Sequence, residues 1–152
     1  MGLDAVRAGI GLYGCEDAGA GLRPALALRA TITHVRPLPP GATVGYGASW
    51  RAERLSLVAT ATIGYADGVH RARGNRGEVL VRGRRVPLIG RVSMDAITLD
   101  VTAAPDVEVG DTATLVGRDG EEAISAEEVA AWSGTISYEV LTAIGPRVER
   151  RY

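Results

Sequence analysis

The chain contains no lysine and no phenylalanine. All 17 of its positively charged side chains are arginine, set against 18 Asp and Glu, for a formal net charge of -1. A Schiff base with a carbonyl group requires a primary amine, which a guanidinium does not supply. The sequence therefore excludes amine–carbonyl chemistry by its own side chains, although exclusive use of arginine is also what a GC-rich genome produces.

Cysteine is almost absent as well. Cys15 is the single cysteine, so no disulfide can form within the chain, and a reducing compartment fits. Residues 1–4 lack the basic flank and apolar run of a secretion signal, and Val6 stands where a myristoylation motif needs Ser or Thr. No apolar run is long enough to cross a bilayer. These absences predict a cytoplasmic protein without membrane contact.

Charge and size further limit the class of protein and the number of domains. A pI near 6.1 argues against a nucleic-acid-binding protein. The 152 residues are 46% hydrophobic, which is enough for one domain with a buried core.

Alternation of apolar and polar residues predicts half-buried strands. Between positions 55 and 63, Leu57, Ala59 and Ala61 share one face, whereas Thr60 and Thr62 share the other. The same period, or a turn between two apolar runs, predicts further strands over 26–32, 78–81, 85–89, 95–102, 112–116 and 147–150.

Helix is expected only near the end of the chain. Ser125 and Glu128 form a capping-box signal that opens a helix, and Gly134 ends it. A second short helix is predicted over 138–144. Many short strands with few helices predict a mainly β protein, a small barrel or sandwich.

Residues that carry chemistry are few. Three tyrosines, Tyr46, Tyr65 and Tyr138, lie in turn-like contexts where a phenol serves either in proton transfer or as an amphipathic strand end. His34 continues an apolar face and is predicted at the edge of the core. With His70 and one cysteine it makes no metal site.

A series of short motifs runs through nearly the whole chain, from about Asp4 to Tyr152. They are Asp4-x-Val6-Arg7-x-Gly9-Ile10-x-x-Tyr13-Gly14, Val44-Gly45-Tyr46-Gly47, Gly64-Tyr65-Ala66-Asp67-Gly68 with Arg71, Gly90-Arg91-Val92-Ser93-Met94-Asp95, Tyr138-Glu139-Val140 and Arg147-Val148. In this order the motifs resemble the C-terminal part of alanine racemase, a family that interconverts L- and D-alanine with pyridoxal phosphate.

The resemblance implies a mainly β domain that follows an N-terminal β/α barrel. Residues 1–14 then correspond to the end of that barrel, 15–22 to a linker and 23–152 to the β domain. In the family the barrel binds the cofactor through a lysine, and the β domain completes the active site over the barrel of a partner subunit. A homodimer is implied for the full enzyme, and no cofactor is expected on this chain alone.

The resemblance also implies roles for individual residues. Tyr46 matches the base that exchanges the α-proton on the L-alanine face, and Arg7 the arginine that faces the pyridine nitrogen. Gly9, Ile10 and Tyr138 match the groups that bind the cofactor phosphate.

Further matches surround the substrate. Tyr65, Met94 and Asp95 correspond to substrate-binding positions, with the Met94 N–H directed at the carboxylate. Three more residues match the lining of the entrance: Arg71, Arg91 and Ile136.

Two hypotheses follow for function. In the first, the chain is the C-terminal domain of a racemase that supplies D-alanine for peptidoglycan, and it is inactive alone. In the second, it is a stand-alone β module of the same descent, used for binding or regulation. Retention of Tyr46, Tyr138, Met94 and Asp95 favours the first.

Overall fold

The protein is described by a computed structural model that covers residues 4–5, 7–15 and 21–152. The predicted barrel remnant over 1–14 and the predicted linker over 15–22 therefore lie partly outside the described residues. Within the described part of the chain, no helix has both the length and the apolar character needed to cross a bilayer.

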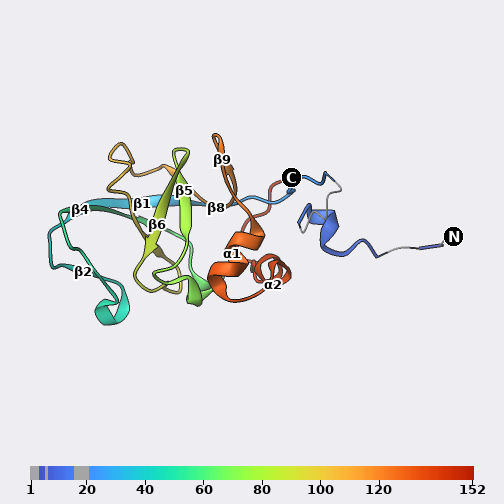
Figure 1. The fold of residues 1–152 in the computed structure, drawn as a ribbon, viewed down its shortest axis with the longest axis horizontal. Coiled ribbons are helices and arrows are strands. Elements are labelled where there is room, and N and C mark those ends of the chain that lie inside the picture. Colours follow the sequence, from blue (N-terminus) through green and yellow to red (C-terminus); the bar gives the residue numbers. More distant parts are fainter. Residues whose placement is uncertain (1–3, 6, 16–20) are drawn as a thin grey trace.

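A closed antiparallel β-barrel forms the body of the molecule (Figure 1). Neighbouring strands of the barrel follow the order β1-β4-β7-β6-β5-β8, and direct pairing of β1 with β8 closes the ring. This confirms the predicted small barrel. The strands are β1 (Leu28–Leu38), β4 (Ser56–Ala61), β5 (Glu78–Val81), β6 (Arg84–Ile89), β7 (Ile97–Asp100), β8 (Thr112–Asp119) and β9 (Glu122–Ile124), which pairs with β8 outside the ring.

Closure depends on the long strand β1. Its first part, from Leu28, pairs with β8, and its second part, to Leu38, pairs with β4. The register shifts between Ile32 and His34, as at a β-bulge, which interrupts the alternation of faces. His34 is consequently exposed, so its predicted place at the core edge is wrong.

Aliphatic side chains fill the barrel, and a second, smaller cluster lies outside it. Val58 of β4 and Ile89 of β6 belong to this outer cluster, together with Val44 and the half-buried Trp50. Val44 lies in β2 (Thr43–Val44) and Trp50 in β3 (Trp50–Arg51), a hairpin that covers this part of the barrel wall. The hairpin is thus anchored by apolar contact as well as by its own ladder.

Two α-helices, α1 (Ala126–Ser133) and α2 (Ser137–Thr142), lie at one end of the barrel (Figure 1). Both predicted helices are confirmed. Ser125 and Glu128 form the predicted capping box, and Gly134 adopts φ 72° at the end of α1. The strand predicted over 147–150 does not form: Arg147 lies in a turn, Val148 in a bend, and residues 149–150 have no regular structure.

The N-terminal segment contains a short 3₁₀ helix, η1 (Gly9–Tyr13). Figure 1 shows η1 beyond the barrel wall, near the C-terminus of the chain. A hydrogen bond of 3.0 Å from the Ala25 N–H to the Tyr13 carbonyl ties η1 to the start of the β domain.

Candidate active site

Tyr46 lies at the tip of the β2–β3 hairpin, at the start of the 3₁₀ turn η2 (Tyr46–Ala48). Gly45 and Gly47 have φ values of 76° and 70°, and Ala48 has φ 48°, a conformation that is strained for a residue with a Cβ. The turn leaves Tyr46 71% exposed. Its phenol is therefore presented outward by a backbone of unusual conformation.

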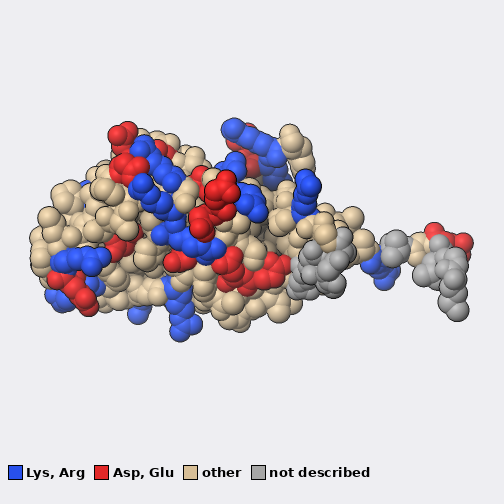
Figure 2. All heavy atoms as spheres, turned by 45° about the horizontal axis from the view of Figure 1, so that its top comes forward, with Lys and Arg blue, Asp and Glu red and all other residues tan. Residues whose placement is uncertain are grey.

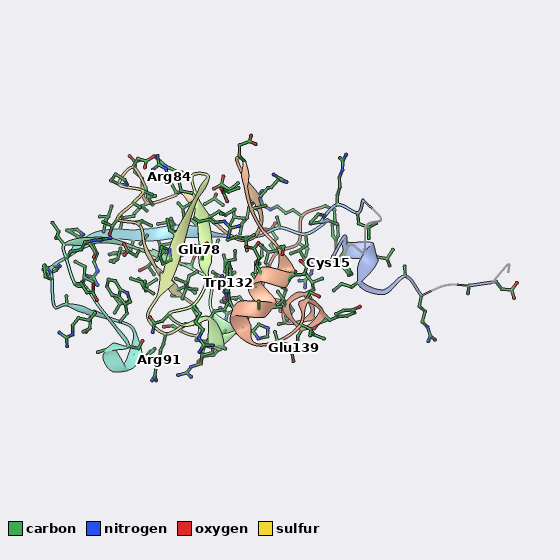
Figure 3. The ribbon with its side chains drawn as sticks, in the orientation of Figure 1. Cys15, Glu78, Arg84, Arg91, Trp132 and Glu139 are labelled. Atoms are coloured by element: carbon green, nitrogen blue, oxygen red, sulfur yellow. The ribbon has the colours of Figure 1, made fainter. Side chains whose placement is uncertain are left out.

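Arg91 packs directly against this turn. A Cβ on Gly45 would lie 2.8 Å from the Arg91 backbone nitrogen, and one on Gly47 would lie 3.7 Å from the Arg91 guanidinium carbon. Figure 3 shows Arg91 beside η2. The fold thus brings together Tyr46 and Arg91, which are far apart in sequence. It also brings Arg71 near, because the Gly74 N–H donates to the Arg71 carbonyl at 3.2 Å and Gly74 abuts Arg91.

Tyr65 and Met94 are brought together by backbone hydrogen bonds. Tyr65 opens the 3₁₀ turn η3 (Tyr65–Asp67), and its N–H donates to the Ser93 carbonyl at 3.0 Å. The next N–H, of Ala66, donates to the Met94 carbonyl at 3.0 Å. A Cβ on Gly64 would lie 2.3 Å from the Met94 oxygen, so only glycine permits this approach. Tyr65 and Met94 remain 44% and 51% exposed.

An ion-pair bridge fastens the same two loops from the C-terminal side. Arg147 Nε lies 3.2 Å from Asp67 Oδ1, and Arg147 Nη2 lies 2.5 Å from Asp95 Oδ1. The hydrogen bond to Asp95 and the charge of Asp67 raise the pKa of the Arg147 guanidinium. Asp67 also accepts the Gly64 N–H at 2.8 Å. In the sequence, Arg147 and Asp67 stand only as parts of motifs, and their pairing could not be predicted because it depends on tertiary contact.

The remaining candidates lie elsewhere. Gly9, Ile10 and Tyr138 line one groove of about 770 Å³ between η1 and α2. Arg7 precedes η1, is exposed, and is not among the described residues that line this groove. Ile136 is 61% exposed at the start of α2. Among the residues that the structure describes, no group of three or more His, Cys, Asp or Glu is placed to hold a metal.

Comparison with known families identifies the domain. A family model described as "Alanine racemase, C-terminal domain" matches residues 25–152. The chain belongs to the alanine racemase C-terminal domain family. This confirms the resemblance drawn from the motifs.

Curated relatives of this racemase domain are longer proteins. An alanine racemase from Halothermothrix orenii is 44% identical over 157 residues and matches 100% of the chain. One from Methylobacterium sp. is 47% identical over 152 residues and matches 97% of the chain. The chain spans only 41% of the length of each.

Solved structures of alanine racemases share the domain's fold. The enzyme from Bacillus anthracis with bound L-Ala-P gives a TM-score of 0.86 at 40% identity, over 92% of the chain and 37% of that structure. The enzyme from Bartonella henselae with covalently bound pyridoxal phosphate gives a TM-score of 0.88 at 34% identity, over 95% of the chain and 40% of that structure.

Proposed function

We propose that the chain is the C-terminal β domain of a cytoplasmic, pyridoxal-phosphate-dependent alanine racemase that supplies D-alanine for peptidoglycan. The names of its relatives support the activity, and the Bartonella henselae structure supports the cofactor. In this proposal residues 1–14 end a β/α barrel, 15–22 form a linker and 23–152 form the β domain. The chain matches 41% of the Halothermothrix orenii relative, and we assign the barrel to the remainder of that protein.

The single observation that carries the proposal is the exposed Tyr46. A phenol that is 71% exposed at the tip of an anchored hairpin suits a site completed by another surface. We assign that surface to the barrel of a partner subunit in a homodimer. Arg91, Tyr65 and Met94 lie in loops fixed by close backbone contacts, so they would meet the same surface in a defined arrangement.

The residues present suit part of the cofactor. Gly9 and Ile10 begin η1, where backbone N–H groups lack helical partners and would donate to a phosphate, and Tyr138 lines the same groove. The Arg7 guanidinium would face the pyridine nitrogen. The cofactor supplies acidification of the Cα–H bond of alanine. The chain has no side-chain amine to attach it.

Each residue then has a task on this chain. The Tyr46 hydroxyl moves the α-proton on the L-alanine face, while the barrel lysine serves the opposite face. The Met94 N–H binds the substrate carboxylate, next to Asp95, which Arg147 holds in place. Tyr65, Arg71, Arg91 and Ile136 line the entrance.

The proposal is tested by recombining the domain with its barrel. We expect the purified chain with added cofactor to show no alanine racemisation, and a lysine-bearing barrel domain to restore it. Tyr46→Phe should lower the restored rate by a factor of about 10² to 10⁴, because it removes only the proton-transfer group. Racemisation by the chain alone, or full activity of Tyr46→Phe, would refute the assignment. A partner bound independently of Tyr46, with no restored activity, would favour a stand-alone binding module instead.

A further inference from the structure

Three backbone segments that are distant in sequence converge beneath Tyr46. They contain Gly45, Gly74 and Gly90. A Cβ on Gly45 would lie 2.8 Å from the Arg91 nitrogen, one on Gly74 would lie 3.1 Å from the Arg91 Cα, and one on Gly90 would lie 2.9 Å from Val44 Cγ1. The segments approach one another closely, so hydrogen bonds between them can fix their relative position in addition to the apolar packing of Val44.

Asn75 makes those hydrogen bonds. Its backbone N–H donates to the Gly90 carbonyl at 3.1 Å, and its side-chain Oδ1 accepts the Gly90 N–H at 2.6 Å. Its Nδ2 donates to the Ser49 carbonyl at 3.2 Å and to Ser49 Oγ at 3.3 Å. Ser49 directly follows η2, the turn that contains Tyr46. One amide group therefore connects the Tyr46 turn to the turn that precedes Arg91.

The loop that carries Asn75 is anchored to the barrel by the buried Arg73. Arg73 is 1% exposed, donates to the Glu78 carbonyl at 2.8 Å and stacks on Trp132 at 5.4 Å. The Arg76 N–H donates to the Arg73 carbonyl at 2.8 Å, which closes a tight turn around Asn75. Asn75 is thus held from the barrel end and can in turn hold the hairpin tip.

The residue type matches this task. Asn75 has φ 59°, a left-handed conformation in which asparagine and aspartate are several-fold enriched among residues with a Cβ. An amide side chain offers, on two separate atoms, both the acceptor that Gly90 needs and the donor that Ser49 needs.

We infer that Asn75 is a positioning residue for the base of the reaction: it fixes the Tyr46 turn against the Arg91 turn. The inference rests on the proposed role of Tyr46. It matters because a base must lie within hydrogen-bond reach of the proton it takes, and a displacement of about 1 Å costs on the order of 10²-fold in rate.

The Asn75 tie, meaning the side-chain hydrogen bonds of Asn75 to Gly90 and Ser49, can be tested on the chain alone by amide hydrogen exchange. Asn75→Gly keeps the left-handed backbone and removes both side-chain ties, so exchange of the Gly90 and Ala48 amides should accelerate by about fivefold, the equivalent of one hydrogen bond. Asn75→Asp keeps the acceptor for Gly90 but loses the donor for Ser49, so only Ala48 should respond. Arg76→Gly, in the same loop, is the matched control and should change neither amide. Unchanged Gly90 and Ala48 exchange in Asn75→Gly would overturn the inference.

The catalytic consequence is measured on the chain recombined with the barrel domain. For Asn75→Gly we expect kcat/KM to fall about tenfold. We also expect the deuterium isotope effect to rise with α-deuterated L-alanine, whose deuterium Tyr46 removes, and not with α-deuterated D-alanine. A purely structural defect lowers the amount of active enzyme and leaves both isotope effects unchanged, which would overturn the inference. If Tyr46→Phe retains full activity, the proposed function fails, and the exchange experiment judges the Asn75 tie by itself.

Discussion

At the scale of single residues, the molecule places a positive charge where most domains place an aliphatic side chain. Arg73 is 1% exposed, and its partners are one carbonyl oxygen and the face of Trp132. Burial lowers its pKa to about 10, so the guanidinium stays protonated at neutral pH. The stacked pair joins the 3₁₀ turn η4 (Arg71–Arg73) to α1, and so connects the loop that carries Arg71 to the helical end of the barrel.

Gly64 sets the contact between the Tyr65 and Met94 loops. Its φ of -147° is open to any residue, so the steric contact alone requires glycine. We expect Gly64→Ala to lower the free energy of unfolding by about 2 to 3 kcal/mol, because the new methyl would meet the Met94 and Ser93 carbonyl oxygens. Urea unfolding measures this. Gly11→Ala is the control, since its nearest contact would be an ordinary 3.7 Å from Leu22. Equal stability of the two variants would contradict the prediction.

At the scale of elements, α1 is a short helix whose two ends are closed in different ways. At its start, Ser125 Oγ accepts the Glu128 N–H at 3.2 Å, and Glu128 accepts the Ser125 N–H at 2.9 Å. At its end, Ser133 Oγ donates to the Val129 carbonyl at 2.7 Å, a bond that duplicates one the helix already makes. Ser125 therefore caps the helix, whereas Ser133 only adds a hydrogen bond to a carbonyl that is already paired.

Replacing these serines one at a time tests the cap. Ser125→Ala should lower the free energy of unfolding by about 1 kcal/mol, because the N-terminal donors lose their acceptor. Ser133→Ala should change it by less than about 0.5 kcal/mol, since alanine is the better helix former. Thermal unfolding followed by circular dichroism compares the variants. Matching losses would show that the capping box does not hold α1.

At the scale of the whole molecule, charges of both signs interleave over one face, as Figure 2 shows. Arg82, at the turn between β5 and β6, pairs with Asp111 at 2.7 Å and Asp106 at 3.5 Å in the connection between β7 and β8. A backbone hydrogen bond from Glu108, and then the Arg82 side chain, hold the pKa of Asp111 below its usual value. These exposed pairs contribute little each, but they link two loops across the barrel rim.

Acid should weaken this link in a defined direction. Because the folded state lowers the pKa of Asp106 and Asp111, protons bind the unfolded chain preferentially. Their stabilisation is present above a pH of about 4 and is lost as the pH falls through the folded-state pKa. Arg82→Gln should make the fall in the free energy of unfolding between about pH 4 and pH 2 less steep. Urea unfolding at several pH values tests this.

The control for that series is Arg76→Gln. Arg76 is exposed and makes no ion pair among the residues that the structure describes, so its variant should follow the pH dependence of the parent chain. If Arg82→Gln also follows the parent curve, the pKa of Asp111 owes its lowering to the backbone hydrogen bond alone.

Local patterns predicted most elements correctly, because the forces behind them act between near neighbours. The alternation around Ala59 predicted β4, and the capping box at Ser125 predicted α1. The two left-handed residues Arg82 and Gly83 form the predicted hairpin turn. Where a distant contact decided the outcome, the patterns were wrong. A bulge moved His34 outward, and residues 147–150 formed no strand.

By itself, the sequence determined what this chain cannot do and which family it resembles. With no lysine it offers no side-chain amine for a carbonyl, and its ordered motifs resembled the domain that the family comparison then confirmed. Only the tertiary structure decided how the site is held. The Arg147 bridge between Asp67 and Asp95, and the Asn75 tie beneath Tyr46, join segments that meet only once the barrel has closed. Periodicity and capping are short-range signals, whereas these contacts depend on strand pairing across the whole chain.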